Sequence, residues 1–268
     1  MLSLSLKRFF RNKVFTTLLS VFYLVMIWQF VGLWQITRES TFTQLSFLGN
    51  TLSYAPFVFA FFLLISFEYV YRIHQEKVSE CVGSSSYGLS RYYSSSILAL
   101  LILLLPLVAM FLGSNLYNYL SQSEVNYIYI AQIFAHAVFE FFVVGLIAIF
   151  LGTAIAFTAS KLKAYLILCL AAFLFLPLTE FSLLLDFFSY RTQNTLQSVF
   201  GLFDIFAPDL EWWQPILGVS LLPYRIGLFF FWLALLSLVL SALLNRSPQR
   251  SWRVLITQFV MVVVQAFP

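Results

Sequence analysis

Residues 14–34, VFTTLLSVFYLVMIWQFVGLW, decide the fold class of this chain. They run for 21 positions without a charged side chain. A helix that crosses a bilayer needs about 20 consecutive, mostly apolar residues, whereas an apolar stretch of about 10–14 residues is more typical of a buried core helix. We therefore expect residues 14–34 to form a membrane-spanning helix.

Five more apolar runs long enough to span follow along the chain. None shows the weak alternation of apolar and polar residues that marks a strand of a membrane β-barrel. Because only helices and closed barrels span a bilayer, these runs are expected to be helices. The expected spans cover residues 52–71, 95–115, 130–157, 164–185 and 226–244. The predicted fold class is an all-α polytopic membrane protein with six transmembrane helices. Because little chain is left over, residues 1–268 are expected to form a single transmembrane domain.

The overall composition agrees with this fold class. Hydrophobic residues make up 61% of the chain and charged residues 10%, whereas an ordinary soluble domain is about 45–50% apolar and about 25% charged. This composition excludes a cytosolic globular enzyme, a nucleic-acid-binding protein and a disordered chain. Two cysteines are too few for a disulfide framework or a thiolate metal site. The expected surroundings are the lipid bilayer, with no nucleic-acid partner.

Lys and Arg are unevenly distributed over the connections. Cytoplasmic loops of membrane proteins carry an excess of these residues. Twelve lie on one side of a six-span arrangement, namely Lys7, Arg8, Arg11, Lys13, Arg72, Lys77, Arg91, Lys161, Lys163, Arg246, Arg250 and Arg253. Three lie on the other side, namely Arg38, Arg191 and Arg225. We therefore expect a multi-pass protein with both termini in the cytoplasm.

The N-terminal segment before the first span is basic and amphipathic. On a helical wheel its side chains divide into an apolar arc of Leu2, Leu6, Phe9 and Phe10 and a basic arc of Lys7, Arg8 and Arg11. Leu4 and Lys13 fall outside this pattern. A basic amphipathic helix of this kind lies along a membrane surface, so we expect an interfacial helix that leads into the first span.

A polar segment, residues 72–96, separates the second and third expected spans. Glu76 and Glu80 are four residues apart and so share one face of a short helix, which Gly83 to Ser86 would end. Their carboxylates are expected to be free to meet a partner. Arg91 then begins the approach to the third span. The segment is either a solvated loop with a basic anchor or a docking helix for a cytoplasmic partner.

Two further segments are apolar without being clear spans. The connection of residues 186–225 lies on the predicted outer side and has apolar stretches at residues 196–206 and 215–224. It is expected to form either short re-entrant half-helices or an amphipathic lid, and we favour the half-helices. Residues 254–267 are short for a span, so they are expected to form an amphipathic or partly inserted end.

The expected spans contain a small set of ionisable residues. Glu140 lies inside the fourth span, with His136 one turn away on the same face, and Glu180 lies toward the outer end of the fifth span. Carboxylates within a bilayer are costly and usually face a cavity or a partner. These three residues either line a polar path or, in the case of Glu140, form a helix–helix hydrogen bond. A separate stripe of Ala148, Gly152 and Ala156 predicts close helix packing.

The order of these features resembles the permease subunits of type-2 ABC transporters (ABC-2). The matching residues are Lys7, Arg8 and Arg11 in the N-terminal helix, Glu76 and Glu80 in the cytoplasmic helix, Gly83 at the break, and Ser90 with Arg91 at the start of the third span. The chain departs from the family at the break, where it has Cys81-Val82-Gly83 and no Pro. The resemblance covers all six spans in order and loop length.

The resemblance implies that the chain supplies a translocation path. It also implies a docking loop for the partner, formed by Glu76, Glu80, Gly83 and Arg91. It also implies a separate cytoplasmic ATP-binding subunit and a second permease copy or paralogue. ATP would be hydrolysed in the partner, since the chain has no G-x-x-x-x-G-K-[ST] phosphate loop. The chain itself is then expected to have no enzymatic activity and no cofactor.

Two alternatives from other classes remain open at the level of sequence. One is an intramembrane lipid-modifying enzyme that uses His136, Glu140 and Glu180. The other is a non-catalytic membrane assembly subunit. Neither an H-E-x-x-H motif nor a G-x-S-x-G motif is present, and the most distinctive polar block lies in the expected cytoplasmic segment. These observations favour the permease.

Overall fold

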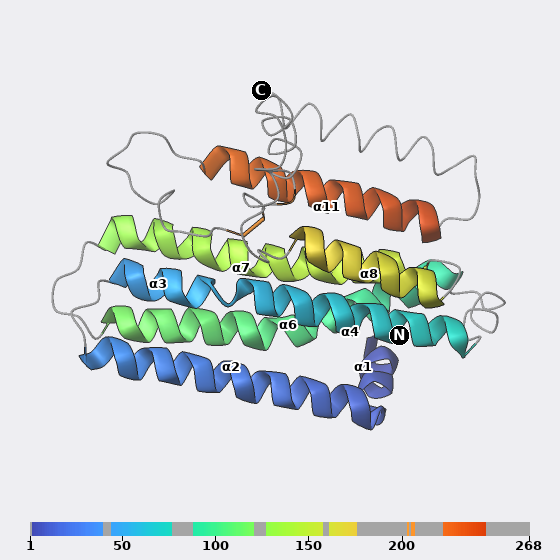
Figure 1. Cartoon of the computed structure of the whole chain (residues 1–268), viewed down its shortest axis with the longest axis horizontal. Helices are drawn as coiled ribbons and strands as arrows, with labels where there is room; N and C mark the ends of the chain where they lie inside the picture. The colour runs from blue at the N-terminus through green and yellow to red at the C-terminus, as the bar shows by residue number, and fades with distance from the viewer. Residues whose placement is uncertain are drawn as a thin grey trace, which may run out of the picture.

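A computed structural model describes residues 2–39, 44–76, 88–120, 127–157, 161–175, 203, 205–206 and 222–244. Almost all of these residues lie in helices, and none lies in a strand (Figure 1). The helices are α1 (Leu2–Arg11), α2 (Lys13–Glu39), α3 (Gln44–Leu52), α4 (Ala55–Gln75), α6 (Gly88–Leu120), α7 (Tyr127–Ala156), α8 (Lys161–Phe175) and α11 (Leu222–Leu244). The predicted all-α fold class is confirmed for this part of the chain.

All helices except α1 lie side by side with roughly parallel axes (Figure 1). Helices α4 and α7 share the most extensive contact and occupy the centre of the bundle. Helices α2 and α11 lie on opposite outer sides, and α1 crosses one end of the bundle (Figure 1). The arrangement therefore places the N-terminal helix where the long helices begin or end.

Five of the described helical segments are long and apolar enough to cross a membrane. They are Lys13–Gln35, Asn50–Ile73, Arg91–Asn118, Ala137–Ala156 and Ile226–Leu243. Each coincides with one of the expected spans, and the chain is a multi-pass membrane protein. Helix α8 is apolar from Leu162 to Phe175 but shorter. The expected span at residues 164–185 begins in α8, and its remainder, residues 176–185, lies outside the described residues.

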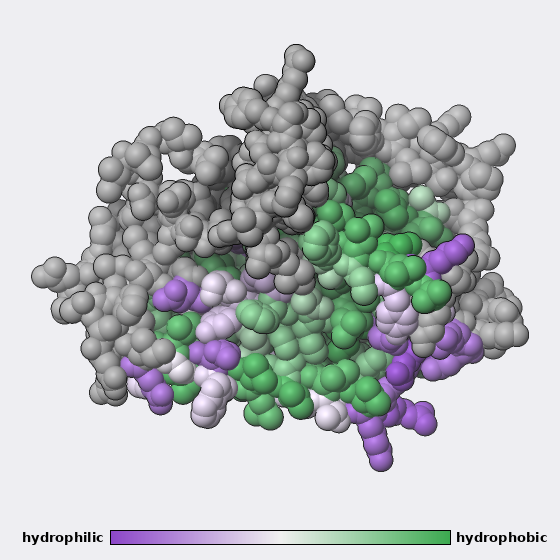
Figure 2. Space-filling model, viewed as in Figure 1, coloured by the Kyte–Doolittle hydropathy of each residue, from purple (hydrophilic) through white to green (hydrophobic). Residues whose placement is uncertain are grey.

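The outer surface of the bundle is apolar along its middle. On α2, Leu24 is 65% exposed and Trp28 is 77% exposed. Figure 2 shows hydrophobic residues over the middle of one face and hydrophilic residues toward its two ends. Apolar surface costs about 25 cal/mol per Å² when it faces water, whereas lipid tails solvate it without this cost. The exposed belt is the surface expected of helices that lie in a bilayer.

Two helix boundaries differ from those expected. Helix α4 continues through Gln75, and α6 begins at Gly88, so both ends of the expected loop at residues 72–96 are helical. Arg72 is part of α4 because its guanidinium lies 4.8 Å from the Phe15 ring and 3.7 Å from the Glu68 carboxylate one turn earlier. These contacts let the helix continue past the apolar run.

The small-residue stripe on α7 packs against α4, as the sequence predicts. Ala148 and Ala156 are buried. A methyl group on Gly152 would overlap the Ser66 hydroxyl and the Leu63 carbonyl of α4. The missing side chain lets the two central helices approach closely.

Candidate functional site

The turn between α1 and α2 sets the direction in which α1 leaves the bundle. Asn12 lies between the two helices, and its side-chain oxygen accepts a hydrogen bond of 3.1 Å from the Val14 amide. Asparagine is a strong N-cap residue because it satisfies an amide that the helix itself cannot pair. Asn12 therefore begins α2 immediately after α1 ends at Arg11, and the short turn leaves α1 across the end of the bundle.

An aromatic cluster holds the apolar side of α1. The Phe9 side chain is 1% exposed. Its ring stacks on Phe15 of α2 at 5.4 Å between centroids and meets the edge of Tyr69 of α4 at 5.6 Å. The expected apolar arc is only partly buried, because Phe10 faces outward and is 50% exposed. Phe9 is thus the main apolar anchor of α1.

Polar contacts join the buried side of α1 to the bundle. The Tyr69 hydroxyl donates to the backbone carbonyl of Ser5 at 2.9 Å. The Ser5 and Ser95 hydroxyls lie 2.9 Å apart and share a hydrogen bond between α1 and α6. Both serines are buried, where a polar group without a partner would be costly. These contacts fix α1 on α4 and α6 together.

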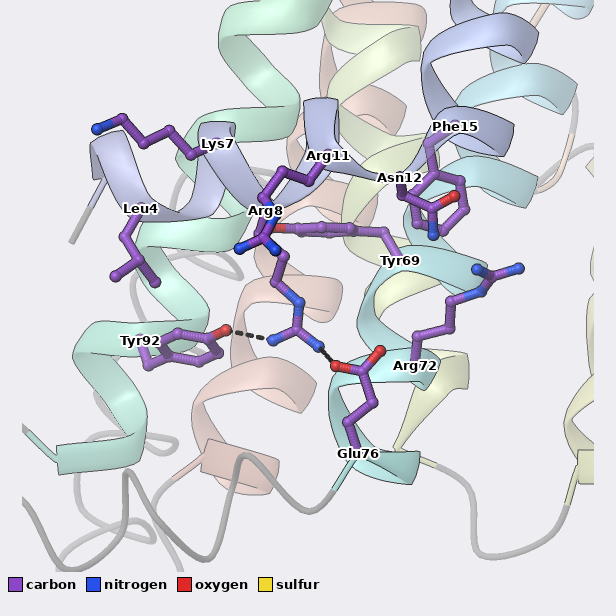
Figure 3. Close-up of a pocket in the computed structure, with 10 residues that line it drawn as sticks. All are labelled: Leu4, Lys7, Arg8, Arg11, Asn12, Phe15, Tyr69, Arg72, Glu76 and Tyr92. Atoms are coloured by element: carbon purple, nitrogen blue, oxygen red, sulfur yellow. Dashed lines mark hydrogen bonds and ion pairs between the residues drawn. The ribbon is translucent and has the colours of Figure 1, made fainter.

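Arg8 links α1 to the ends of two helices. One guanidinium nitrogen donates to the Tyr92 hydroxyl of α6 at 2.6 Å, and the other pairs with the Glu76 carboxylate at the end of α4 (Figure 3). Glu76 immediately follows α4, and Tyr92 lies in the first turns of α6. Arg8 therefore spans both ends of the connection between α4 and α6. We call the contacts of Ser5, Arg8, Phe9, Tyr69, Glu76, Tyr92 and Ser95 the α1 junction.

An open pocket of about 710 Å³ lies at the α1 junction. It is lined by Leu4, Lys7, Arg8, Arg11, Asn12, Phe15, Tyr69, Arg72, Glu76 and Tyr92 (Figure 3). Four of these side chains are cationic and one is a carboxylate, a surplus of three positive charges. We call it the basic pocket. Its charge suits an anionic group, and its aromatic walls supply apolar contact.

The structure places the expected docking residues in different ways. The prediction that the Glu76 carboxylate is free is wrong, because it pairs with Arg8. Arg91 is exposed near the start of α6. Glu80 and Gly83 lie outside the described residues. Docking at this connection remains a prediction.

The expected path-lining residues are described only at Glu140. It lies in α7 and is 4% exposed, as a group directed into the bundle would be. His136 lies one turn earlier in the same helix, but its side chain is outside the described residues, as is the whole of Glu180. In the segment of the expected half-helices, residues 186–225, the described residues 203 and 205–206 are not helical and residues 222–225 belong to α11. The rest of that segment and the whole tail at residues 254–267 are outside the described residues. A path lined by His136, Glu140 and Glu180 stays a prediction.

Sequence reasoning missed most of the α1 junction. Ser5, Tyr69, Tyr92 and Ser95 were not expected to act together. The available signal is that hydroxyl groups recur near the basic ends of three apolar runs, where buried donors need partners. Within the described part of the chain, no group of three or more His, Cys, Asp or Glu residues could hold a metal ion.

The α1 junction has the charge and shape of a binding and coupling site. It combines a bridging guanidinium, buried hydroxyl contacts and exposed cations around one pocket. Cationic side chains of this kind form charge-assisted hydrogen bonds with anions. Comparison with known proteins finds no matching family model, no matching curated protein and no matching solved structure.

Proposed function

We propose that this chain is the membrane-spanning permease subunit of an ABC transporter of the type-2 class. Its six spans include a fifth that continues α8 to about residue 185. Re-entrant half-helices between residue 186 and the start of α11 at Leu222 precede the last span. Both termini lie in the cytoplasm, and the chain resides in the inner (cytoplasmic) membrane.

The observation that supports this proposal most strongly is the bridge made by Arg8. The expected docking segment, residues 72–96, includes the connection between α4 and α6, and Arg8 contacts Glu76 before this connection and Tyr92 after it. A force on this segment would reach α1 through Arg8. It would then reach α2 through the short turn at Asn12. A permease needs such a connection between its docking loop and its spans.

The distribution of cations supports the proposed orientation. Arg11 and Lys13 flank the turn between α1 and α2, and Arg91 and Lys163 lie in the first turns of α6 and α8. The Tyr165 hydroxyl donates to Glu68, so the start of α8 lies beside the end of α4 that carries the α1 junction. An excess of cations at one end of a helix bundle favours the cytoplasmic side for that end.

Separate ATP-binding subunits dock on the connection between α4 and α6, with Glu80, Gly83 and Arg91 as contact residues. A second permease copy or a paralogue completes the translocation path. ATP hydrolysis in the docked subunits drives alternating exposure of the path. Glu140, with His136 and Glu180, contributes polar groups along that path.

The test is capture of the partner from native membranes with tagged chain in a mild detergent. We expect a phosphate-loop ATPase to co-purify with the wild type. The variant Glu80→Lys with Arg91→Glu reverses two contact charges and keeps the net charge, so capture should fall strongly. The control Lys163→Gln lies outside the connection and should capture normally. Capture of no ATPase, or equal capture by all three proteins, contradicts the proposal, as does stoichiometric nucleotide binding by the isolated chain.

A further inference from the structure

We propose that the basic pocket binds the phosphate headgroup of an anionic phospholipid from the adjacent leaflet. The inference does not rest on the proposed function. It requires only that the apolar helices lie in a bilayer and that the pocket has the described charge and position.

Two of the four cations that line the pocket are available to bind an anion. Arg8 pairs with Glu76, and Arg72 lies 3.7 Å from Glu68. Lys7 and Arg11 are exposed on α1, and neither has a carboxylate partner among the described residues. These two cations are therefore available to an anion in the pocket. The charge-assisted hydrogen bonds that they offer to a phosphate are stronger than neutral ones.

The pocket lies at the level expected for lipid headgroups. Three apolar segments begin or end beside the pocket, because Asn12 precedes Lys13–Gln35, Arg72 lies near the end of Asn50–Ile73, and Tyr92 lies near the start of Arg91–Asn118. The ends of apolar spans mark the level of lipid headgroups. Basic pockets between helices at the membrane surface are suited to anionic headgroups. The phosphate of a lipid in the adjacent leaflet would lie at this level.

An exposed apolar surface adjoins the pocket. Leu4 lines the pocket and is 56% exposed, and Val14 in the first turn of α2 is 53% exposed. An exposed apolar face then continues along α2 through Leu18, Val21, Leu24, Val25 and Trp28. Acyl chains would cover this face while the headgroup occupies the pocket. A soluble phosphate ester would leave it bare, so the observations favour a lipid.

The test uses the full chain, purified in detergent, with phosphatidylglycerol or phosphatidylcholine added as mixed micelles. Retained lipid is counted by native mass spectrometry, and thermal stabilisation is followed in parallel. The pocket variant is Lys7→Gln with Arg11→Gln. The matched control is Lys13→Gln with Lys163→Gln, which removes two exposed cations that do not line the pocket. Both variants lose the same charge, so they separate a specific site from general attraction.

We expect wild type and control to retain phosphatidylglycerol in preference to phosphatidylcholine. The pocket variant should bind phosphatidylglycerol about tenfold more weakly or worse, since a hydrogen bond to a charged group contributes about that factor. Lys7→Arg with Arg11→Lys keeps both cations and should bind like the wild type. Without lipid, the pocket variant should unfold at the same temperature as the wild type, which shows that its fold is intact.

Three outcomes overturn the inference. Equal losses in the pocket variant and the control would show diffuse attraction to anionic lipid. Retention of phosphatidylcholine equal to that of phosphatidylglycerol would show that the pocket does not recognise the negative charge of the headgroup. Displacement of phosphatidylglycerol by inorganic phosphate or glycerol phosphate at similar concentration would show that the site serves a soluble anion.

Discussion

At the scale of single residues, Arg8 carries the connection between three helices. Its planar guanidinium offers several N–H groups in a fixed fork, so one side chain reaches both the Tyr92 hydroxyl and the Glu76 carboxylate. The two partners lie 84 and 68 residues away in sequence. Residue types and local spacing predicted that Arg8 lies on a basic face, but they hold no information on partners so distant. This part of the site could not be predicted from the sequence.

The first prediction concerns the two contacts of Arg8. Glu76→Gln should cost no more than about 1 kcal/mol, because the Glu76 side chain is 59% exposed and ion pairs near water are weak. Arg8→Ala should cost about 1–3 kcal/mol, because it also leaves the Tyr92 hydroxyl without its partner. Thermal unfolding in detergent measures both. Arg11→Ala on the exposed face is the control and should leave the apparent Tm unchanged.

A loss for Glu76→Gln as large as that for Arg8→Ala would contradict this account, since the ion pair would then be the dominant contact. A loss for Arg11→Ala of similar size would show that any charge removed from α1 destabilises it.

The second prediction concerns the hydroxyl of Tyr69, which lies behind Phe9. Tyr69→Phe keeps the ring contact with Phe9 but removes the hydrogen bond to the Ser5 carbonyl. Stability should fall by about 1 kcal/mol, the usual net contribution of one such bond. Hydrogen exchange of the α1 amides should rise, because α1 is held less firmly. Unchanged exchange in α1, compared with exchange in the wild type, would show that this bond does not hold the helix.

At the scale of elements, helices were predictable and their ends were not. The apolar run at residues 14–34 became α2, Lys13–Glu39, because length and uniform apolarity leave a bilayer-spanning segment few other forms. Helix α4 ends at Gln75, beyond the expected end at residue 71, because its last turn depends on the tertiary contact of Arg72 with Phe15. The break before Ala55, which opens α4, was also not expected, although Pro56 is well suited to a first helical turn.

The third prediction concerns the contact of the two central helices. Gly152→Ala places a methyl group against the Ser66 hydroxyl and the Leu63 carbonyl, and backbone atoms of α4 cannot move aside without shifting the helix. Overpacking of this kind costs about 1–3 kcal/mol, so the apparent Tm should fall. Gly113→Ala on α6 is the matched control, because nothing lies within 4 Å of its added methyl group.

The control should be neutral or slightly stabilising, since alanine favours helix over glycine. If both glycine variants lose the same stability, the loss comes from the backbone change alone. Close packing of α4 on α7 would then not explain the small-residue stripe.

At the scale of the whole molecule, charge and apolarity are arranged along one axis. One face of the bundle has an apolar middle and hydrophilic ends (Figure 2), and α1, the basic pocket and the start of α8 share one end. Composition alone predicted the membrane class because so much apolar surface cannot be hidden within 268 residues. The contacts of the α1 junction form only when α1, α4 and α6 pack together at this end of the bundle. They therefore could not be predicted from the sequence.

The last prediction tests the topology of the whole chain. The native cysteines, Cys81 and Cys169, are first replaced by serine, and single cysteine reporters are then introduced. Because twelve Lys and Arg residues are expected on the cytoplasmic side and three on the other, reporters at Ser40, Ser121 and Gln193 should react with an impermeant thiol reagent in intact cells. Reporters at Ser84, Ser160 and Ser247 should react only after permeabilisation, which also serves as the control that every site is reactive. Ser247 is the decisive position, because it follows α11. Its labelling in intact cells would place the two ends of the chain on opposite sides and require an odd number of spans, so that α8 would not continue into a complete crossing.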